Sequence, residues 1–246
     1  DQGKARSRWI IRPSVSNSPR PSTLRPPSQM TPWMRLIPAL LALFLLIGCE
    51  GFQQGERQDA EATLTTSEFP AIVAPLIDPV KLDTLKGKRA ATPRLRKACY
   101  WLEIARREDN DLEIVLDESH ALTGPHKPER MKAQKDSLIR NVTILERLGC
   151  LDEAGMIKLR KGNAPTITKG PYAGEIVTGD HIIPRSVTPE LDNTLFNLEM
   201  MPLTLNQRKA AKVTARQLDL AKRWHKAGLL SDEGLRAVIR TGAEGR

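Results

Sequence analysis

Two neighbouring residues, Asp180 and His181, carry side chains that could act together in hydrolysis. An imidazole is the natural general base near neutral pH, because its pKa lies close to that pH. The carboxylate of Asp180 and the amide oxygen of Asn206 are hard ligands that suit Mg²⁺, which keeps several waters for itself. Lys209 lies one helical turn beyond Asn206, so a helix would present both on one side and let the lysine hold a phosphate. These residue types predict metal-assisted cleavage of a phosphodiester.

The element that carries Asp180 and His181 must meet one geometric condition. Neighbouring residues on a regular strand point to opposite faces of the sheet. The two side chains can therefore serve one site only if the strand ends or distorts at this point. Gly179 and Pro184 flank the pair and favour such a break.

Residues 162–246 differ in sequence pattern from the helical stretches before them. Glycines and prolines separate short β-prone pieces, and the predicted order is strand, strand, loop, helix. In chain order, the expected elements are strands at Thr166–Thr168 and Glu175–Thr178, a loop through Asp192, and helices over Leu203–Val213, Ala215–Lys226 and Ser231–Ile239.

The order of these residues resembles a known family. Asp180-His181-Ile182-Ile183-Pro184, then Asn197-Leu198, then Asn206 and Lys209 are similar to the His-Asn-His (HNH) nucleases, also called the ββα-metal or His-Me finger fold. In that family a strand ends in Asp-His-Ile-hydrophobic-Pro, and an Asn-Leu pair follows a loop. A short helix then carries Asn or His, with a Lys three residues later. Asn197 precedes Asn206 by nine positions, as in the family pattern, and the resemblance covers roughly residues 165–215.

The resemblance implies a role for each matched residue. His181 would be the general base on water, and Asn197 would order the loop that positions it. Asp180 and Asn206 would hold a single divalent ion, usually Mg²⁺, with Mn²⁺ as an alternative. Cleavage would leave a 3′-hydroxyl and a 5′-phosphate. Lys209 and Arg185 would contact phosphate. Apart from the resemblance, the basic run that includes Arg208 and Arg216 is also expected to contact phosphate.

Three features depart from the family pattern. The family's last His is Asn206 here, which is a common variant. Many members carry two Cys-x-x-Cys pairs that bind a structural zinc, and this chain has none. No zinc is therefore expected, and packing, including against the preceding helices, must hold the module. Gly179 stands where an apolar residue is usual, which concerns the strand geometry rather than the chemistry.

Residues 78–161 are predicted to form a helical scaffold. Apolar residues recur at helical spacing in four stretches, and the expected helices are Pro93–Arg107, Leu112–Leu122, Lys127–Leu148 and Leu151–Leu159. Three prolines interrupt the apolar stretch Phe69–Pro79, which predicts an extended segment. His120 and His126 lack metal-ligand spacing and are predicted to be solvated. The predicted fold class is α+β, with a mainly helical N-terminal part and a C-terminal ββα-metal module with flanking helices.

The first part of the chain is predicted to be a targeting segment. Residues 1–33 are rich in Ser, Pro and Arg, and we expect a disordered or mis-called leader, with an organellar transit peptide as an alternative. Residues 34–48 contain an apolar run too short to span a bilayer, which is typical of a signal peptide. The run ends in Leu-Ile-Gly-Cys49, which resembles the lipobox of bacterial lipoproteins. Residues 49–77 would then form a tether behind a lipid anchor.

Lipidation of Cys49 would leave Cys99 and Cys150 as a pair in an oxidising compartment. They are predicted either to form a disulfide or to remain two buried thiols.

Charge and aromatic content narrow the partners. The formal net charge is +9, but seven basic residues lie within the first 48 residues, so the remainder is close to balance. Between Gln207 and Lys226, seven basic residues stand against Asp219 alone, which predicts either contact with a phosphate backbone or a solvated helix face. Aromatic residues make up only 4%, which argues against a module that stacks unpaired bases on successive rings.

Together these patterns favour an exported, lipid-anchored, metal-dependent endonuclease in a bacterial cell envelope, on the periplasmic side of the outer membrane, with DNA favoured over RNA. One alternative is a non-catalytic envelope lipoprotein that binds nucleic acid, anionic lipid or a protein partner. Another is a cytoplasmic nuclease whose start is mis-called. The sequence does not decide whether the protein has an immunity or inhibitor partner.

Overall fold

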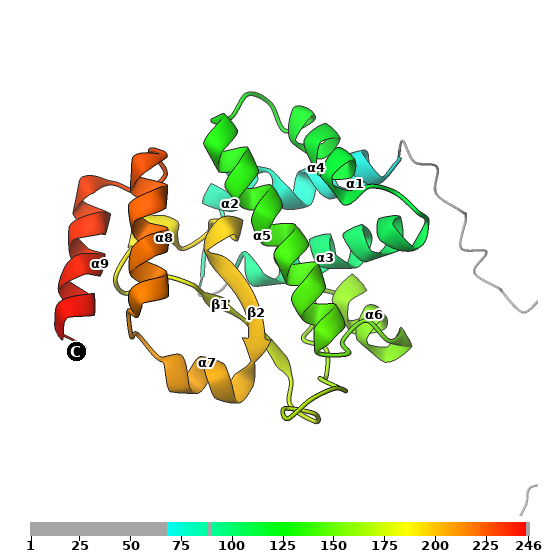
Figure 1. Ribbon diagram of the computed structural model, residues 1–246. Coiled ribbons are helices and arrows are strands. Elements are labelled where there is room, and N and C mark those ends of the chain that lie inside the picture. Colours follow the sequence, from blue (N-terminus) through cyan, green and yellow to red (C-terminus); the bar gives the residue numbers. More distant parts are fainter. Residues whose placement is uncertain (1–67, 88–89, 245–246) are drawn as a thin grey trace, which may run out of the picture. The chain divides into compact units, whose positions relative to one another are not determined.

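Residues 68–87 and 90–244 are described by a computed structural model and belong to one compact unit of the chain (Figure 1). They combine helices with a two-stranded antiparallel sheet, so the predicted α+β class is confirmed. The leader, the signal peptide, the lipidation of Cys49 and the tether up to residue 67 lie outside the described residues. Within these ranges, no helix is both long and apolar enough to cross a membrane.

The helices before the sheet form a scaffold around a buried apolar cluster. The four predicted helices are confirmed as α3 to α6, with each end within two residues of its expected position. Leucines at helical spacing, such as Leu95 and Leu102 on α3, are fully buried. The bounds are α1 (Glu68–Ile77), α2 (Pro79–Asp83), α3 (Thr92–Arg107), α4 (Leu112–Ala121), α5 (Pro128–Arg147) and α6 (Glu153–Arg160).

The prediction of an extended segment over Phe69–Pro79 was wrong, because α1 occupies most of it. Proline is tolerated in the first turn of a helix, and Pro75 removes only one interior hydrogen bond. Phe69, Val73 and Ile77 recur every four residues and are all fully buried. Burial of this apolar stripe outweighs the cost of the proline, which a rule based on proline alone does not capture.

The sheet pairs β1 (Val177–His181) with β2 (Leu198–Pro202). Its register runs from Val177 opposite Pro202 to His181 opposite Leu198. The strand predicted at Thr166–Thr168 is present only as a single bridge to Ile176. The second strand is instead β2, which follows two short 3-10 helices, η2 (Pro189–Leu191) and η3 (Leu195–Asn197), and leads directly into α7 (Leu203–Lys209).

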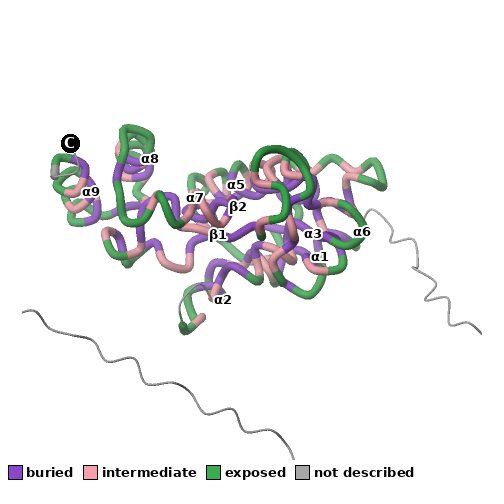
Figure 2. The backbone as a smooth tube through the Cα atoms, turned by 90° about the horizontal axis from the view of Figure 1, so that it is seen from below, coloured by how far each residue is buried: buried purple, intermediate pink, exposed green. Residues whose placement is uncertain are grey.

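The outer edge of β2 is closed by polar side chains of α5. The Asn141 side chain accepts from the Met200 amide at 2.7 Å and donates to the Leu198 carbonyl at 3.1 Å. The Ser137 hydroxyl donates to the Leu195 carbonyl at 3.0 Å. A two-stranded sheet is marginal alone, so its docking on α5 stabilises it. Figure 2 shows both strands as largely buried segments in the interior of this unit.

The chain ends in two amphipathic helices, α8 (Ala215–Lys226) and α9 (Asp232–Glu244). The expected bounds of α8 are confirmed, and α9 extends beyond its predicted end. The helix expected over Leu203–Val213 stops at Lys209, because Ala210 takes a positive φ of 47°. A second apolar cluster holds this region, with Phe196 and Trp224 packed edge to face at 5.0 Å between ring centroids.

The structure bears on two predictions about buried side chains of the scaffold. Cys99 and Cys150 are free thiols, so the disulfide alternative is not formed. Burial raises the pKa of each thiol to about 12. The prediction that His120 is solvated was wrong, because it lies on the packed face of α4 one turn after Leu116 and is only 3% exposed.

Candidate functional site

The end of β1, the turn that follows it and α7 together line one open pocket of about 440 Å³. Asp180, His181, Arg185 and Asn206 all contribute to its wall. These residues are distant in sequence, and the antiparallel pairing of β1 with β2 brings α7 back beside them. The pocket therefore gathers four of the predicted site residues.

Gly179 is explained by the packing of β1 on α3. A Cβ atom at this position would lie 2.6 Å from Cγ2 of Thr92, which is closer than real Cβ atoms approach their neighbours. The absence of a side chain thus lets the strand press against the first turn of α3. β1 then ends at His181, the last paired residue, so the condition for Asp180 and His181 to share one pocket is met.

The imidazole of His181 is held through one nitrogen. Its Nε2 lies 2.8 Å from the carbonyl oxygen of Asp192, and a carbonyl can only accept, so Nε2 carries the hydrogen. The neutral ring then has its lone pair on Nδ1. The Asp192 carboxylate Oδ1 lies 3.1 Å from the same Nε2. This arrangement orients a ring that is itself 6% exposed.

Asp192 was not assigned a role from the sequence, which placed it only within a loop. It stands eleven residues after His181, and no spacing rule connects a loop carboxylate to a histidine at that distance. The side chain also lies 3.5 Å from Arg185, measured from Oδ2 to Nη1. Asp192 therefore links the histidine to the basic residue on the pocket wall.

Asn197 is fully buried and ties the loop to the end of β1. Its Oδ1 accepts from the Ile183 amide at 2.8 Å, and its Nδ2 donates to the carbonyls of Ile183 at 3.1 Å and Leu191 at 3.3 Å. The backbone carbonyl of Asn197 also accepts from the Ile182 amide at 2.7 Å. Asn197 does not line the pocket, so it is a positioning residue for the segment that follows His181.

Lys209 forms an ion pair within the site. Its ammonium lies 2.6 Å from Oδ2 of Asp180 and 2.6 Å from the carbonyl oxygen of His181. Both side chains of this ion pair are less than one-fifth exposed. The predicted contact of Lys209 with a phosphate stays a prediction, and in this structure the lysine is paired with Asp180.

Asn206 presents its amide in a defined orientation. Its Nδ2 donates to the Thr178 hydroxyl at 3.0 Å, and that hydroxyl donates to the Met201 carbonyl at 3.2 Å. The amide nitrogen is thereby committed to β1, so Oδ1 is the atom left for a ligand. Thr178 is a second residue that the sequence did not single out.

The remaining predicted phosphate contacts differ in their surroundings. Arg185 lines the pocket and is 39% exposed. Arg208 is exposed on α7 and does not line the pocket. Arg216 is held by both oxygens of Glu199, which raises its pKa, and Arg140 contacts the same carboxylate at 3.2 Å. This pairing joins α8 to β2, and the phosphate contact predicted for Arg216 stays a prediction.

In the part of the chain that the structure describes, no group of three or more His, Cys, Asp and Glu side chains is placed to hold a metal ion. The pocket wall does carry two side chains with oxygen atoms that could coordinate a metal ion, the carboxylate of Asp180 and the amide of Asn206. Comparison with known proteins found no matching family model, curated protein or solved structure.

Proposed function

We propose that this chain is a metal-dependent endonuclease of the ββα-metal (HNH) type that hydrolyses phosphodiester bonds, with DNA favoured over RNA. The observation that supports it most is the convergence of His181, Asp180 and Asn206 on one pocket, with the histidine held through Nε2. An orienting partner on one ring nitrogen leaves the other as a general base.

His181 acts through Nδ1 in this proposal. Nδ1 takes a proton from a water molecule while the water oxygen forms a bond to phosphorus. The bond from phosphorus to the 3′ oxygen breaks, and that oxygen takes a proton from solvent, so the products carry a 3′-hydroxyl and a 5′-phosphate. The contact of Nε2 with Asp192 stabilises the imidazolium that results. His181 then returns its proton to solvent.

The donor set of the pocket fits a single Mg²⁺ ion, with Mn²⁺ as an alternative. The Asp180 carboxylate and the Asn206 amide oxygen are hard donors on the same wall, and the amide is oriented by its bond to Thr178. When bound, the ion supplies positive charge at the phosphate and the leaving oxygen. Lys209 must then share Asp180 with the ion or turn toward the phosphate, because its ammonium already contacts Oδ2.

Export and lipid anchoring through Cys49 belong to the same proposal. They rest on the apolar run and the Leu-Ile-Gly-Cys sequence, which lie outside the described residues. Labelling of cells with a fatty-acid analogue, followed by comparison of the wild type with Cys49→Ala, tests the anchor. Label on the wild type alone supports it, and an unlabelled wild type contradicts it.

The activity is tested with purified protein, plasmid DNA and a mixed RNA, in Mg²⁺ or in EDTA. We expect cutting that requires Mg²⁺ and is lost in His181→Ala. His126→Ala is the matched control, because His126 lies outside the pocket and its ring contacts the Thr123 carbonyl. Folded protein that cuts neither polymer with several divalent ions would contradict the proposal and favour a binding role.

A further inference from the structure

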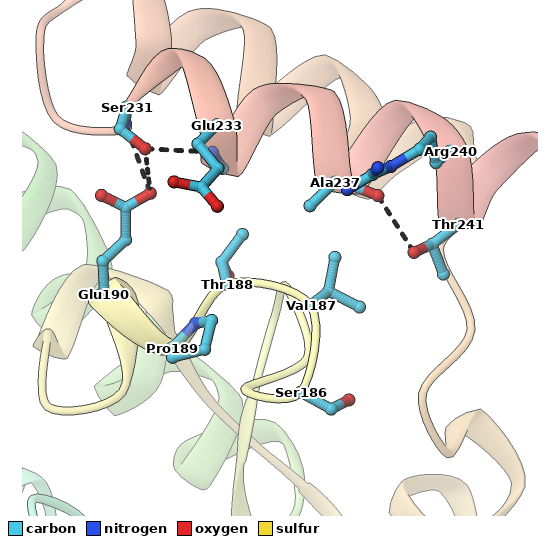
Figure 3. A pocket seen from close by; sticks show the side chains of 11 residues that line it. Ser186, Val187, Thr188, Pro189, Glu190, Ser231, Glu233, Ala237, Arg240 and Thr241 are labelled. Carbon is cyan, nitrogen blue, oxygen red and sulfur yellow. Dashed lines mark hydrogen bonds between the residues drawn. The ribbon is translucent and has the colours of Figure 1, made fainter.

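A second pocket adjoins the candidate site. It has a volume of about 620 Å³ and lies between the turn Ser186–Glu190 and helix α9 (Figure 3). Ser186 lines both this pocket and the one that contains His181, so the two pockets share one wall residue. A volume in the range of about 300 to 1,000 Å³ is typical of sites for small organic ligands.

Thr188 adds to the lining of this pocket a buried hydroxyl that has no hydrogen-bond partner in the described part of the chain. The residue is 1% exposed, lines the pocket, and its hydroxyl has no hydrogen-bond partner among the described residues. Buried hydroxyls are usually bonded, because desolvation without a partner costs about 1–3 kcal/mol. In Figure 3 the Thr188 side chain rises from the turn toward α9. A ligand in the pocket would supply the missing partner.

The end of the pocket near Thr188 is lined by carboxylates. Glu190 accepts from the Ser231 hydroxyl at 2.7 Å, which fixes it at the start of α9. Figure 3 shows the Glu233 carboxylate hanging from α9 toward the turn, beside Glu190. Within the described structure, Glu233 has no hydrogen bond or ion pair of its own, so it is available to accept from a ligand.

The other end of the pocket is basic. Arg240 lies seven residues after Glu233 on α9, which is two helical turns, or about 10 Å along the axis. Both side chains line the pocket, and Arg240 is exposed. A ligand that spans them needs hydrogen-bond donors at one end and negative charge at the other.

We propose that this pocket binds the nucleotide next to the scissile phosphodiester, with its base at Glu233 and Thr188 and its outer phosphate at Arg240. The inference rests on the proposed function, which places the scissile phosphate in the neighbouring pocket. Guanine fits best, because its pairing edge offers two adjacent N–H donors to the two oxygens of one carboxylate. Uracil and thymine offer one donor between two acceptors.

This assignment has a consequence for the substrate. A base whose pairing edge contacts Glu233 cannot be paired with another strand. The walls near the base position are Pro189 and Val187 rather than aromatic rings, so the pocket selects by hydrogen bonds and not by stacking. The preferred substrate is therefore single-stranded or locally opened nucleic acid.

The inference is tested first by binding, which does not require cleavage. Guanosine 5′-monophosphate and uridine 5′-monophosphate are titrated into the full chain and followed by NMR. We expect the guanine nucleotide to bind roughly fivefold tighter or more, the lower end of what a bidentate contact to a base discriminates. Glu233→Ala and Glu233→Gln should reduce that ratio, whereas Arg240→Ala should weaken both nucleotides. Arg236→Ala is the control, because Arg236 is exposed on α9 but does not line the pocket.

Equal affinity for the two nucleotides, binding of neither, or a ratio unchanged in both Glu233 variants would overturn the inference. Sequencing of the cut ends from a random single-stranded pool then separates it from the proposed function. Cutting with a guanine preference that weakens in Glu233→Ala supports both. Cutting without a base preference contradicts the subsite alone, whereas a wild type that binds the guanine nucleotide but cuts nothing contradicts the nuclease alone.

Discussion

The ammonium of Lys209 lies 2.6 Å from Oδ2 of Asp180, the carboxylate that would bind the metal ion. The two residues come from α7 and β1, and the pair is largely shielded from solvent. A cation bound at Asp180 would therefore compete with an ammonium that is already present. If Asp180 binds a metal ion, the lysine should weaken that binding.

Replacement of Lys209 by Met should lower the Mg²⁺ concentration that half-saturates the protein. Removal of an ion pair worth about 1 kcal/mol corresponds to a change of roughly fivefold. Binding of Mn²⁺, followed by its paramagnetic effect on water relaxation, measures this without reference to cleavage. Lys212→Met is the control, because Lys212 is exposed and lies outside the pocket. Unchanged or weaker metal binding in Lys209→Met would show that the lysine does not compete.

Asn197→Ala should lower the free energy of unfolding by about 2–4 kcal/mol. The substitution removes three hydrogen bonds and leaves the amide and carbonyl of Ile183 without their side-chain partner in a buried setting. Urea unfolding measures the loss. Asn163→Ala, at an exposed position, should change stability by no more than about 0.5 kcal/mol. Equal stability of the wild type and Asn197→Ala would remove its positioning role.

The sequence predicts local structure best where one helix face decides it. Leu95 and Leu102, and likewise Leu138 and Leu145, are seven residues apart and fully buried, and the helices that carry them lie where expected. β2 could not be predicted in the same way, because its edge is satisfied by Asn141 of a distant helix. That pairing depends on the tertiary fold and leaves no periodic signal.

The candidate site was likewise predictable in part from the sequence, while its remaining contacts depend on the tertiary fold. Asp180, His181 and Asn206 were expected together, because their order along the chain resembles a known pattern. All three line one pocket. Asp192 was missed, since its contact with His181 depends on how the intervening loop folds. The partner of Lys209 was also missed, because charge alone does not tell whether a lysine faces a phosphate or a neighbouring carboxylate.

The buried His120 should make the folded state less stable in mild acid. Burial lowers its pKa below the ordinary value of 6.5, with smaller opposing and supporting contributions from Asp117, Lys135 and His126. The unfolded chain therefore binds a proton at higher pH than the folded protein. The contribution of the neutral ring to stability is fully present above about pH 6.5 and declines as the pH falls from there toward the folded pKa.

Urea unfolding between pH 8 and pH 5 tests this for the wild type and His120→Gln. We expect the wild type to lose more stability than the variant over the interval below pH 6.5. Parallel curves for the two proteins would show that another group is responsible.

The contact between Gly179 and Thr92 predicts a coupled pair of substitutions. In Gly179→Ala the new Cβ would meet Cγ2 of Thr92 at 2.6 Å, and the strand would have to shift away from α3. Overpacking of this kind costs about 1–3 kcal/mol. Thr92→Ala removes the atom that clashes, so the double variant should recover most of the loss measured for Gly179→Ala.

A double-mutant cycle based on urea unfolding measures this coupling. Because the displaced strand carries Asp180 and His181, any cleavage activity should fall in Gly179→Ala and return with Thr92→Ala. Gly174→Ala is the comparison for a glycine without a close neighbour, since no atom lies within 4 Å of its Cβ position; its positive φ of 94° gives it a cost that Thr92→Ala does not relieve. Strictly additive effects of the Gly179 and Thr92 substitutions would mean that this contact does not set the position of β1.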